Sequence, residues 1–298
     1  MAAPSSTFRF LPATLADAIQ RLGIRVRRPV RGRGEGLHRS PDFGASVEFA
    51  DYRAYVPGDP PNRIDWPVYA RTDRTLIRRS IEETSLRATL LLDASASMAF
   101  RQEGPMAKFD YARFLAAGLA YALVRQGDSA ALVPFAGASP LRVPPAASVT
   151  GLRPLLEGLE SLEPAGRADI GAELSAAAER IPSRSLVVIL SDFLQEASAL
   201  ARGLRRLDHD GHNLLLLHVT DAAERRLSFH GVADLRDMET GRRLVVDADD
   251  VARAYAVAAD KHLDALRRAA SDALGEHFLF DTREPVADAL RRVGSSPA

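Results

Sequence analysis

Two polar segments follow apolar runs that have the length of buried β-strands, and they hold the residues best suited to chemistry. The first, residues 93–97, reads Asp-Ala-Ser-Ala-Ser, and the second places Asp192 directly after an apolar run. Asp169, just before an apolar stretch with helical spacing, adds a third carboxylate. The carboxyl ends of parallel strands meet at one sheet edge, and ligands bind in the crevice beyond it. We therefore expect these side chains to gather at that edge.

Oxygen atoms alone make up this set, and oxygen ligands suit hard cations such as Mg²⁺. The spacing of the first segment lets one tight loop offer a carboxylate and two hydroxyls together. Neutral hydroxyls leave a divalent cation under-neutralised, so the cation would favour a carboxylate supplied by a partner. The candidate metal ligands are Asp93, Ser95, Ser97, Asp192 and Asp169.

Strand-like and helix-like segments alternate from about residue 86, which favours a parallel sheet covered on both faces. The predicted fold class is α/β, with a doubly wound, mainly parallel sheet. We expect an irregular N-terminal extension over 1–85, an α/β domain over 86–298, and a β-hairpin insertion at about 226–250. Strands are predicted at 88–93, 129–135, 186–190, 214–219 and 277–281, and helices at 12–22, 111–125, 148–160, 170–180, 197–207, 253–274 and 286–293.

Composition excludes several function classes. The chain of 298 residues has no cysteine, which rules out disulfides and thiolate metal sites. Its 39 basic and 39 acidic side chains give no net charge, which argues against a nucleic-acid partner. Neither lysine, Lys108 nor Lys261, stands in a phosphate-binding P-loop motif. We see no targeting signal and no apolar run long enough for a membrane span, so we expect a cytoplasmic protein.

Enzyme alternatives depend on the same residues. A phosphoaspartate transferase of the haloacid-dehalogenase type would need a second aspartate where Ser95 stands, and the loop is not the G-x-S-x-G nucleophile elbow. A metal-dependent hydrolase of phosphoesters remains an alternative, because Asp93 and Asp192 could hold Mg²⁺ and activate water. No obvious general base accompanies them.

Two motifs carry a resemblance to a known family. Asp-x-Ser-x-Ser at 93–97 resembles the metal-ion-dependent adhesion site of von Willebrand factor A domains. The run YVPGDPPNRIDW at 55–66, followed by Ala70-Arg71, resembles the signature of the DUF58 family, whose members carry a von Willebrand A-like domain. The resemblance extends from about Gly36 through the final helix.

The resemblance implies a non-enzymatic adaptor that works with a MoxR-type AAA+ ATPase and a client protein in assembly or maturation. It also implies Mg²⁺ at the 93–97 loop and at Asp192. The family pattern has threonine where this chain has Ala168, so Asp169 or water would have to replace that ligand. A scaffold with a vestigial adhesion site is the third hypothesis.

The N-terminal segment invites two further predictions. Trp66, the single tryptophan, is expected chiefly to fasten the extension onto the α/β domain, with a partner-binding surface as the alternative. Arg63, Asp65 and Arg71 could form ion pairs near it. The arginine-rich arm at 25–33 is expected to be a solvated loop, in preference to an RNA or lipid contact.

Overall fold

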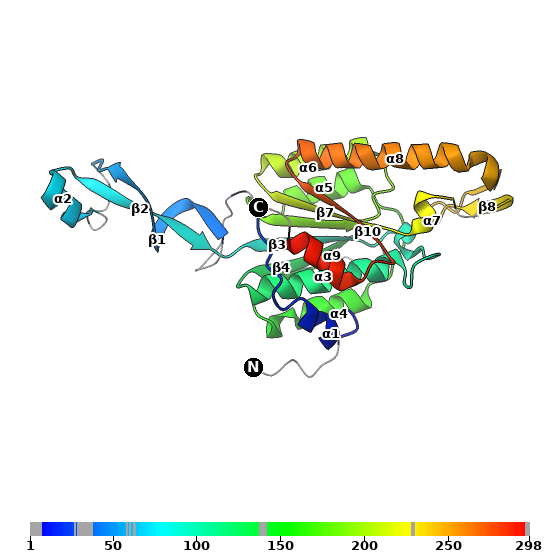
Figure 1. Ribbon diagram of the computed structural model, residues 1–298, viewed down its shortest axis with the longest axis horizontal. Helices are drawn as coiled ribbons and strands as arrows, with labels where there is room; N and C mark the ends of the chain where they lie inside the picture. The colour runs from blue at the N-terminus through cyan, green and yellow to red at the C-terminus, as the bar shows by residue number, and fades with distance from the viewer. Residues whose placement is uncertain are drawn as a thin grey trace.

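The structure is a computed structural model that describes residues 8–26, 28, 38–57, 59, 61, 64–136, 142–227 and 230–295. It has an α/β body, a long two-stranded arm at one end and a short hairpin at the other (Figure 1). No helix in these ranges combines the length and the apolar character needed to cross a membrane.

A six-stranded sheet forms the centre of the body. Its order is β10-β7-β6-β3-β4-β5, with every neighbouring pair parallel except β4 and β5. Numbered along the chain within this sheet, the order is 3-2-1-4-5-6, which is a doubly wound Rossmann-type order. The predicted fold class is therefore confirmed. The strands are β3 (Arg87–Asp93), β4 (Ser129–Phe135), β5 (Val143–Ala146), β6 (Leu186–Ser191), β7 (Asn213–Thr220) and β10 (Glu276–Asp281).

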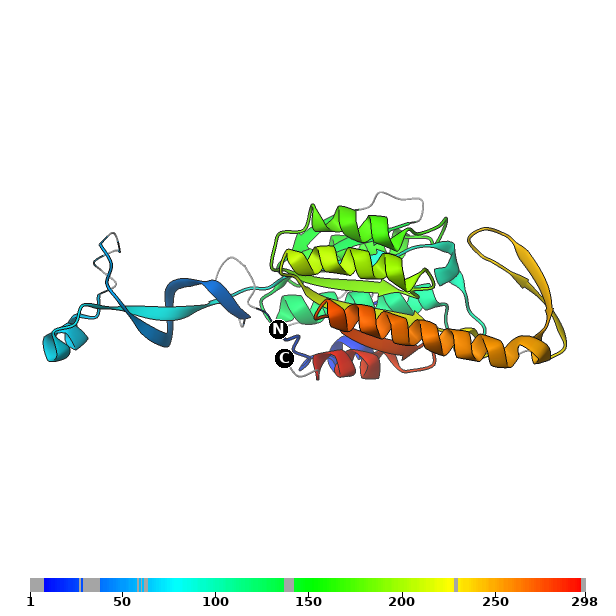
Figure 2. The same ribbon diagram turned by 90° about the horizontal axis from the view of Figure 1, so that it is seen from above.

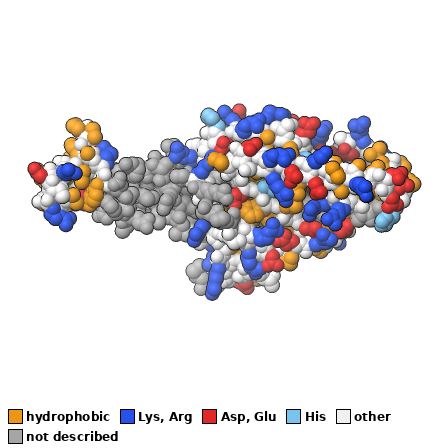
Figure 3. Space-filling view, turned by 45° about the horizontal axis from the view of Figure 1, so that its top comes forward, with side chains coloured by type: hydrophobic (Ala, Val, Ile, Leu, Met, Phe, Trp, Pro, Cys, Tyr) orange, Lys and Arg blue, Asp and Glu red, His pale blue; other side chains and the backbone are white. Residues whose placement is uncertain are grey.

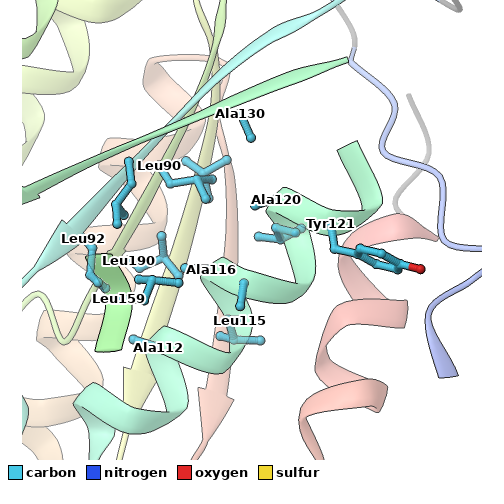
Figure 4. Close-up of a cluster of buried hydrophobic side chains, with 14 of the residues drawn as sticks. Leu90, Leu92, Ala112, Leu115, Ala116, Ala120, Tyr121, Ala130, Leu159 and Leu190 are labelled. Carbon is cyan, nitrogen blue, oxygen red and sulfur yellow. The ribbon is translucent and has the colours of Figure 1, made fainter. Parts of the chain in front are cut away.

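Helices cover both faces of the sheet. Side chains alternate along a strand, so Leu90 and Leu92 of β3 join one hydrophobic cluster and Leu91 joins the other. Figure 4 shows Leu90 and Leu92 beside the apolar face of α3. The first cluster packs against α1 (Ala13–Ala18), α3 (Lys108–Arg125), α4 (Arg153–Ser161) and α9 (Val286–Gly294), and the second against α5 (Ile170–Ala178), α6 (Ala197–His209) and α8 (Ala248–Asp272).

Several element boundaries differ from the predicted ones. Helix α3 begins at Lys108, three residues before the predicted start, and no side chain caps its first turn, so the sequence carries no start signal there. Helix α8 begins at Ala248, because Asp247 accepts a hydrogen bond from the backbone N–H of Asp249. The antiparallel edge strand β5 and the short helix α7 (Ala222–Arg225) were not predicted.

Residues 8–26 and 28 pack on the body. Leu15 and Ile19 are buried in the first cluster. Arg28, in the arm predicted to be solvated, donates from its backbone N–H to Asn213 and from its guanidinium to Asp208 at 2.6 Å. The part of the arginine-rich segment at Arg28 is therefore attached to α6 and β7. Arg27 and residues 29–33 lie outside the described residues.

A long antiparallel pair, β1 (His38–Ala54) and β2 (Leu76–Thr84), projects from the body and carries α2 (Trp66–Thr72) at its far end (Figure 1). The prediction of an irregular segment is wrong for these residues, although the register shifts three times along the pair. Those shifts break the period-2 alternation by which a strand is recognised in a sequence.

The predicted role of Trp66 as a fastener is also wrong. Trp66 lies on α2, away from the body, and is 57% exposed. Asp65 caps α2 and accepts a hydrogen bond from the Tyr52 hydroxyl, while Arg71 donates to the carbonyl of Pro67. The expected Asp65–Arg71 pairing is therefore replaced by local contacts, and Arg63 lies outside the described residues.

The expected hairpin insertion is formed by β8 (Val232–Arg236) and β9 (Arg243–Asp247), paired antiparallel. It lies at the opposite end of the body from the arm (Figure 2).

Candidate functional site

The sheet reverses its winding direction between β3 and β6, and the candidate site lies at the carboxyl ends of these two strands. From β3 the chain proceeds outward through β4 and β5, and it then returns to the other side of β3 to form β6. The two segments that follow such a pair diverge to opposite faces, which leaves the crevice where doubly wound proteins bind ligands. Asp93 ends β3 and Asp192 follows β6, so both predicted aspartates lie at this crevice.

Asp93 is a buried carboxylate held by both strands. It is 1% exposed. One carboxylate oxygen accepts a hydrogen bond from the backbone N–H of Ser95 at 2.9 Å, and the other accepts one from the hydroxyl of Ser191 at 2.6 Å. Ser191 is the last residue of β6, so this bond ties the ends of the two central strands together.

Ser95 and Ser97 present their hydroxyls beside Asp93. Their Oγ atoms lie 3.1 Å apart, because the chain enters the 3₁₀ turn Ala96–Ala99 directly after Ser95. The half-buried Ser97 hydroxyl also lies close enough to the Asp192 carboxylate to lower its pKa. The structure thus brings together four of the five predicted ligands, namely Asp93, Ser95, Ser97 and Asp192.

Asp192 is positioned by a strained turn. Its carboxylate accepts a hydrogen bond from the backbone N–H of Leu194 at 3.3 Å. The intervening Phe193 has a φ of 48°, a left-handed conformation that costs energy for a residue with a side chain. Phe193 is held there by burial, by its N–H bond to the Ser191 hydroxyl and by the His262 ring, which donates to its carbonyl at 2.7 Å.

A buried lysine completes the cluster. Lys108 is fully buried, and its ammonium contacts the carboxylate of Asp192 at 2.7 Å and that of Glu224 at 2.5 Å. Burial alone would lower the pKa of Lys108, but the two carboxylates outweigh it and the pKa is raised. Burial alone would likewise raise the pKa of Asp192, but Lys108 outweighs it and the pKa is lowered. The pair is therefore ionised at neutral pH.

Asp221 fixes the loop that leads to Lys108. Its buried carboxylate accepts hydrogen bonds from the backbone N–H groups of Gln102, Glu103 and Gly104 at 3.0 to 3.2 Å, and it caps α7. The same capping box uses the second oxygen of Glu224, which accepts from the N–H of Asp221. This network positions both the loop before α3 and the carboxylate that Lys108 contacts.

The fifth predicted ligand, Asp169, makes a different contact. It is exposed, and it caps α5 by accepting a hydrogen bond from the backbone N–H of Ala172 at 3.1 Å. Its loop nevertheless lies against the site, since Ala96 donates to the carbonyl of Gly166 and Ala165 donates to that of Ala94. The preceding Ala168 is buried in the second hydrophobic cluster. A ligand role for Asp169 stays a prediction.

The charge balance of the cluster suits a divalent cation. The cluster holds three carboxylates, those of Asp93, Asp192 and Glu224, and one ammonium, that of Lys108, which contacts Asp192 and Glu224. This leaves two formal negative charges. Burial, and then the charge of Asp192, raise the pKa of Asp93 to about 6. A cation beside Asp93 would offset both the cost of burying its charge and the repulsion from Asp192. Each oxygen of Asp93 already accepts one hydrogen bond and keeps a further lone pair for a metal.

The donor set also limits the kind of metal that would bind. Within the described ranges no three His, Cys, Asp or Glu side chains converge as a metal-binding group. A cation at this edge would therefore depend on the hydroxyls of Ser95 and Ser97 for part of its shell. Hydroxyl and carboxylate oxygens fit Mg²⁺, which retains several waters, and fit zinc or copper poorly.

Three residues of this cluster were not predicted as site residues. Lys108 precedes the predicted helix and stands in no P-loop motif; its rarity, as one of two lysines, is the signal in the sequence that marks it. Glu224 lies in a helix that was not predicted. Ser191 ends a predicted strand, but its contact with Asp93 depends on the pairing of β3 with β6, which no local pattern specifies.

A doubly wound α/β domain with an Asp-x-Ser-x-Ser loop at its topological switch point defines the class of this protein. The chain belongs to the DUF58 family, described as a protein of unknown function, whose model matches residues 51–265. Uncharacterized proteins of Mycobacterium tuberculosis (Rv1480) and Mycobacterium bovis are 30% identical over 289 residues, which are 94% of this chain and 89% of each relative.

Solved structures with a similar fold have low sequence identity. The conserved hypothetical protein BatB from Bacteroides thetaiotaomicron is 16% identical (71% of this chain, 100% of that chain, TM-score 0.47). An aerotolerance-related membrane protein from Bacteroides fragilis is 18% identical (70% and 98%, TM-score 0.48), and the SpRpn10 VWA domain is 12% identical (72% and 100%, TM-score 0.44). The von Willebrand A-like assignment rests on the strand order and on family membership.

Proposed function

We propose that this protein is a non-enzymatic interaction adaptor that captures an acidic residue of a partner at the Asp93 site with the help of Mg²⁺. The observation that carries the proposal is the pairing of the Ser95 and Ser97 hydroxyls, 3.1 Å apart, beside a carboxylate cluster with two uncompensated negative charges. Asp93, Ser95, Ser97 and Asp192 would hold the cation, with Asp169 or water in place of the missing threonine hydroxyl. Bound Mg²⁺ would supply positive charge that attracts a carboxylate.

The proposed partner is a MoxR-type AAA+ ATPase, with which this chain would act on a client protein in assembly or maturation. The resemblance of the 55–66 run to the DUF58 signature supports the choice of partner. The chain itself has no lysine in a P-loop motif, so ATP-driven work would come from the partner.

A pull-down of the cognate ATPase tests the proposal. The wild-type protein should capture the ATPase in Mg²⁺ and release it in chelator, while Asp93→Ala should capture little in either buffer. Asp250→Asn, which removes an exposed charge from the first turn of α8, is the matched control and should behave as wild type. Equal capture by wild type and Asp93→Ala, with and without chelator, would refute the metal-bridged mechanism.

The alternative, a metal-dependent hydrolase, is less well supported by the geometry. The Lys108 ammonium lies 2.7 Å from the carboxylate of Asp192 and lowers its pKa, so Asp192 is a poor general base for water even where it helps to hold a cation. The assay is direct: phosphoester turnover in Mg²⁺ or Mn²⁺ that Asp192→Ala abolishes would favour the hydrolase over the adaptor.

A further inference from the structure

The tip of the β8–β9 hairpin lies at the end of the body where β3 and β6 end (Figure 2). The turn is ordered by Asp237, whose carboxylate accepts hydrogen bonds from the backbone N–H groups of Glu239 at 2.8 Å and Thr240 at 3.0 Å. Gly241 follows with a φ of 72°, which favours glycine. The turn therefore holds Glu239 in a defined direction.

Along this hairpin a charged side chain is more buried than the apolar side chains, which is the reverse of the ordinary pattern. The side chain of Glu239 is 17% exposed, whereas Met238 is 44% exposed and Leu244 and Val245 are more than half exposed. Glutamate is among the residues that are least often buried without a partner. Something on the body must therefore hold the carboxylate of Glu239.

Glu239 faces the candidate site itself. Its carboxylate lies 3.7 Å from the guanidinium of Arg167 and is close enough to the Ser97 hydroxyl for that hydroxyl to lower the pKa of Glu239. Burial, and then the charge of Asp192, raise the pKa of Glu239, so the two carboxylates are near enough to repel. Arg167 belongs to the loop whose backbone pairs with residues 94–96. Glu239 thus bridges the two loops that border the site.

We propose that Glu239 is a built-in carboxylate ligand of this site and that the hairpin closes the site until a partner's acidic residue displaces it. The proposal rests on the proposed function, since Glu239 holds the position beside Ser97 that an outside carboxylate would take. Two carboxylates facing one hydroxyl repel each other, and a cation between them would turn that repulsion into attraction. Mg²⁺ therefore tightens the closure.

The base of the hairpin offers a hinge for opening. Gly231 has a φ of 71°, and its carbonyl accepts a hydrogen bond from the backbone N–H of Ala248, the first residue of α8. The strands between this base and the turn expose Val232, Leu244 and Val245, so few buried contacts oppose a swing of the hairpin. The Glu239 contacts are then the principal restraint at the tip.

Hydrogen exchange of the full chain tests the closure without a partner. In metal-free buffer, Arg167→Gln should speed amide exchange over 232–247 by roughly threefold, because it removes the cation that pairs with Glu239. Glu239→Gln removes the same ion pair together with the repulsion from Asp192, so it should speed exchange by a smaller factor. Asp250→Asn removes one negative charge from α8 and should leave hairpin exchange unchanged. Wild-type exchange in both Glu239→Gln and Arg167→Gln would overturn the closure.

Mg²⁺ provides the second arm of the experiment. Added Mg²⁺ should slow hairpin exchange in wild type but not in Glu239→Gln, and calorimetry should record weaker Mg²⁺ binding to that variant. Mg²⁺ binding by wild type with no change in the hairpin would overturn the ligand role of Glu239 and leave the proposed function standing. No Mg²⁺ binding by wild type would refute the metal-assisted function and the ligand role together, and the metal-free comparison then decides the closure alone.

Discussion

The ammonium of Lys108 lies 2.7 Å from the carboxylate of Asp192, and the lysine side chain is fully buried. A cation contributed by the chain therefore stands beside the aspartate that the sequence predicts as a metal ligand. The ammonium compensates one carboxylate of the cluster and leaves the charge of Asp93 and of one further carboxylate open. The negative charge of Asp192 is thus balanced within the protein, whereas the negative charge of Asp93 is balanced only when a cation binds.

Replacing Lys108 by methionine should destabilise the protein by about 3–5 kcal/mol, the cost of leaving buried carboxylates without their partner. The free energy of unfolding, measured by urea denaturation, gives this value. The same variant should gain more stability from added Mg²⁺ than wild type does, because the cluster then carries three negative charges.

Lys261 supplies the matched control, because it is the other lysine and lies exposed on α8. Lys261→Met should unfold at the wild-type urea concentration, with or without Mg²⁺. An equal, small effect of both substitutions would show that the Lys108 pair contributes little.

Ala168 permits a test of the missing hydroxyl. Ala168→Thr should bind Mg²⁺ about tenfold more tightly in calorimetry, since one added contact of about 1.4 kcal/mol has that effect. Ala168 is buried in the same hydrophobic cluster as Leu91 and Phe193, so the larger side chain should also cost about 1–3 kcal/mol of stability. Ala168→Val has the same shape without the hydroxyl and should show the stability cost alone. Equal Mg²⁺ affinity of the two variants would contradict the predicted gain.

The paired histidines of β7 and β10 should make stability depend on pH. Burial, and then the charge of His277, lower the pKa of His218 to about 3, while burial, and then Arg267, lower the pKa of His277 to about 4. The unfolded chain binds protons at about pH 6.5, so stability is complete above that pH and is lost as the pH falls toward 4 and then 3. Each histidine contributes a slope of at most about 1.4 kcal/mol per pH unit.

His277→Gln should remove one of the two histidines that take up a proton when the protein unfolds in acid. Urea denaturation between pH 7 and pH 4.5 should show a shallower loss of stability for the variant than for wild type. Parallel profiles for the two proteins would show that His277 does not titrate on unfolding.

The sequence predicted the sheet well because each core strand is a short apolar run, and a run buried on both faces needs no partner to be recognised. Asp93 and Asp192 were predicted together for the same reason, as residues that end or follow such runs. Lys108 and Glu239 were missed because neither follows a strand of the central sheet. Each reaches the site through a contact between distant segments, namely Lys108 with Asp192 and Glu239 with Arg167.

The strands of the arm were missed for a different reason. Pairing of β1 with β2 shifts register three times, and the bulged strand loses the alternation of apolar and polar residues. The exposure of Trp66 was equally hidden, because the only tryptophan of a chain is expected inside a core and the sequence does not show how far the arm extends.

Because Trp66 is exposed on α2, we expect it to contribute to partner capture and little to stability. With Val56 and Tyr69 it forms an exposed apolar patch at the tip of the arm (Figure 3), and such patches mark interaction sites. Trp66→Ala should leave the free energy of unfolding within about 0.5 kcal/mol of wild type, as exposed substitutions do. Capture of the proposed ATPase should weaken by roughly thirtyfold, the effect of losing about 2 kcal/mol at a tryptophan hot spot.

Val257→Ala, which trims an exposed apolar residue of α8 on the body, is the control and should leave capture unchanged. A large loss of stability in Trp66→Ala would instead restore the structural role, and unchanged capture would remove the arm's tip from the interface. Trp66 lies on α2 at the far end of the two-stranded arm, whereas Asp93 ends β3 in the body (Figure 1). Loss of capture in both Trp66→Ala and Asp93→Ala would therefore indicate either one partner that contacts the arm and the body or two separate partners. A double variant distinguishes these cases, because one partner predicts a coupled loss and two partners predict independent losses.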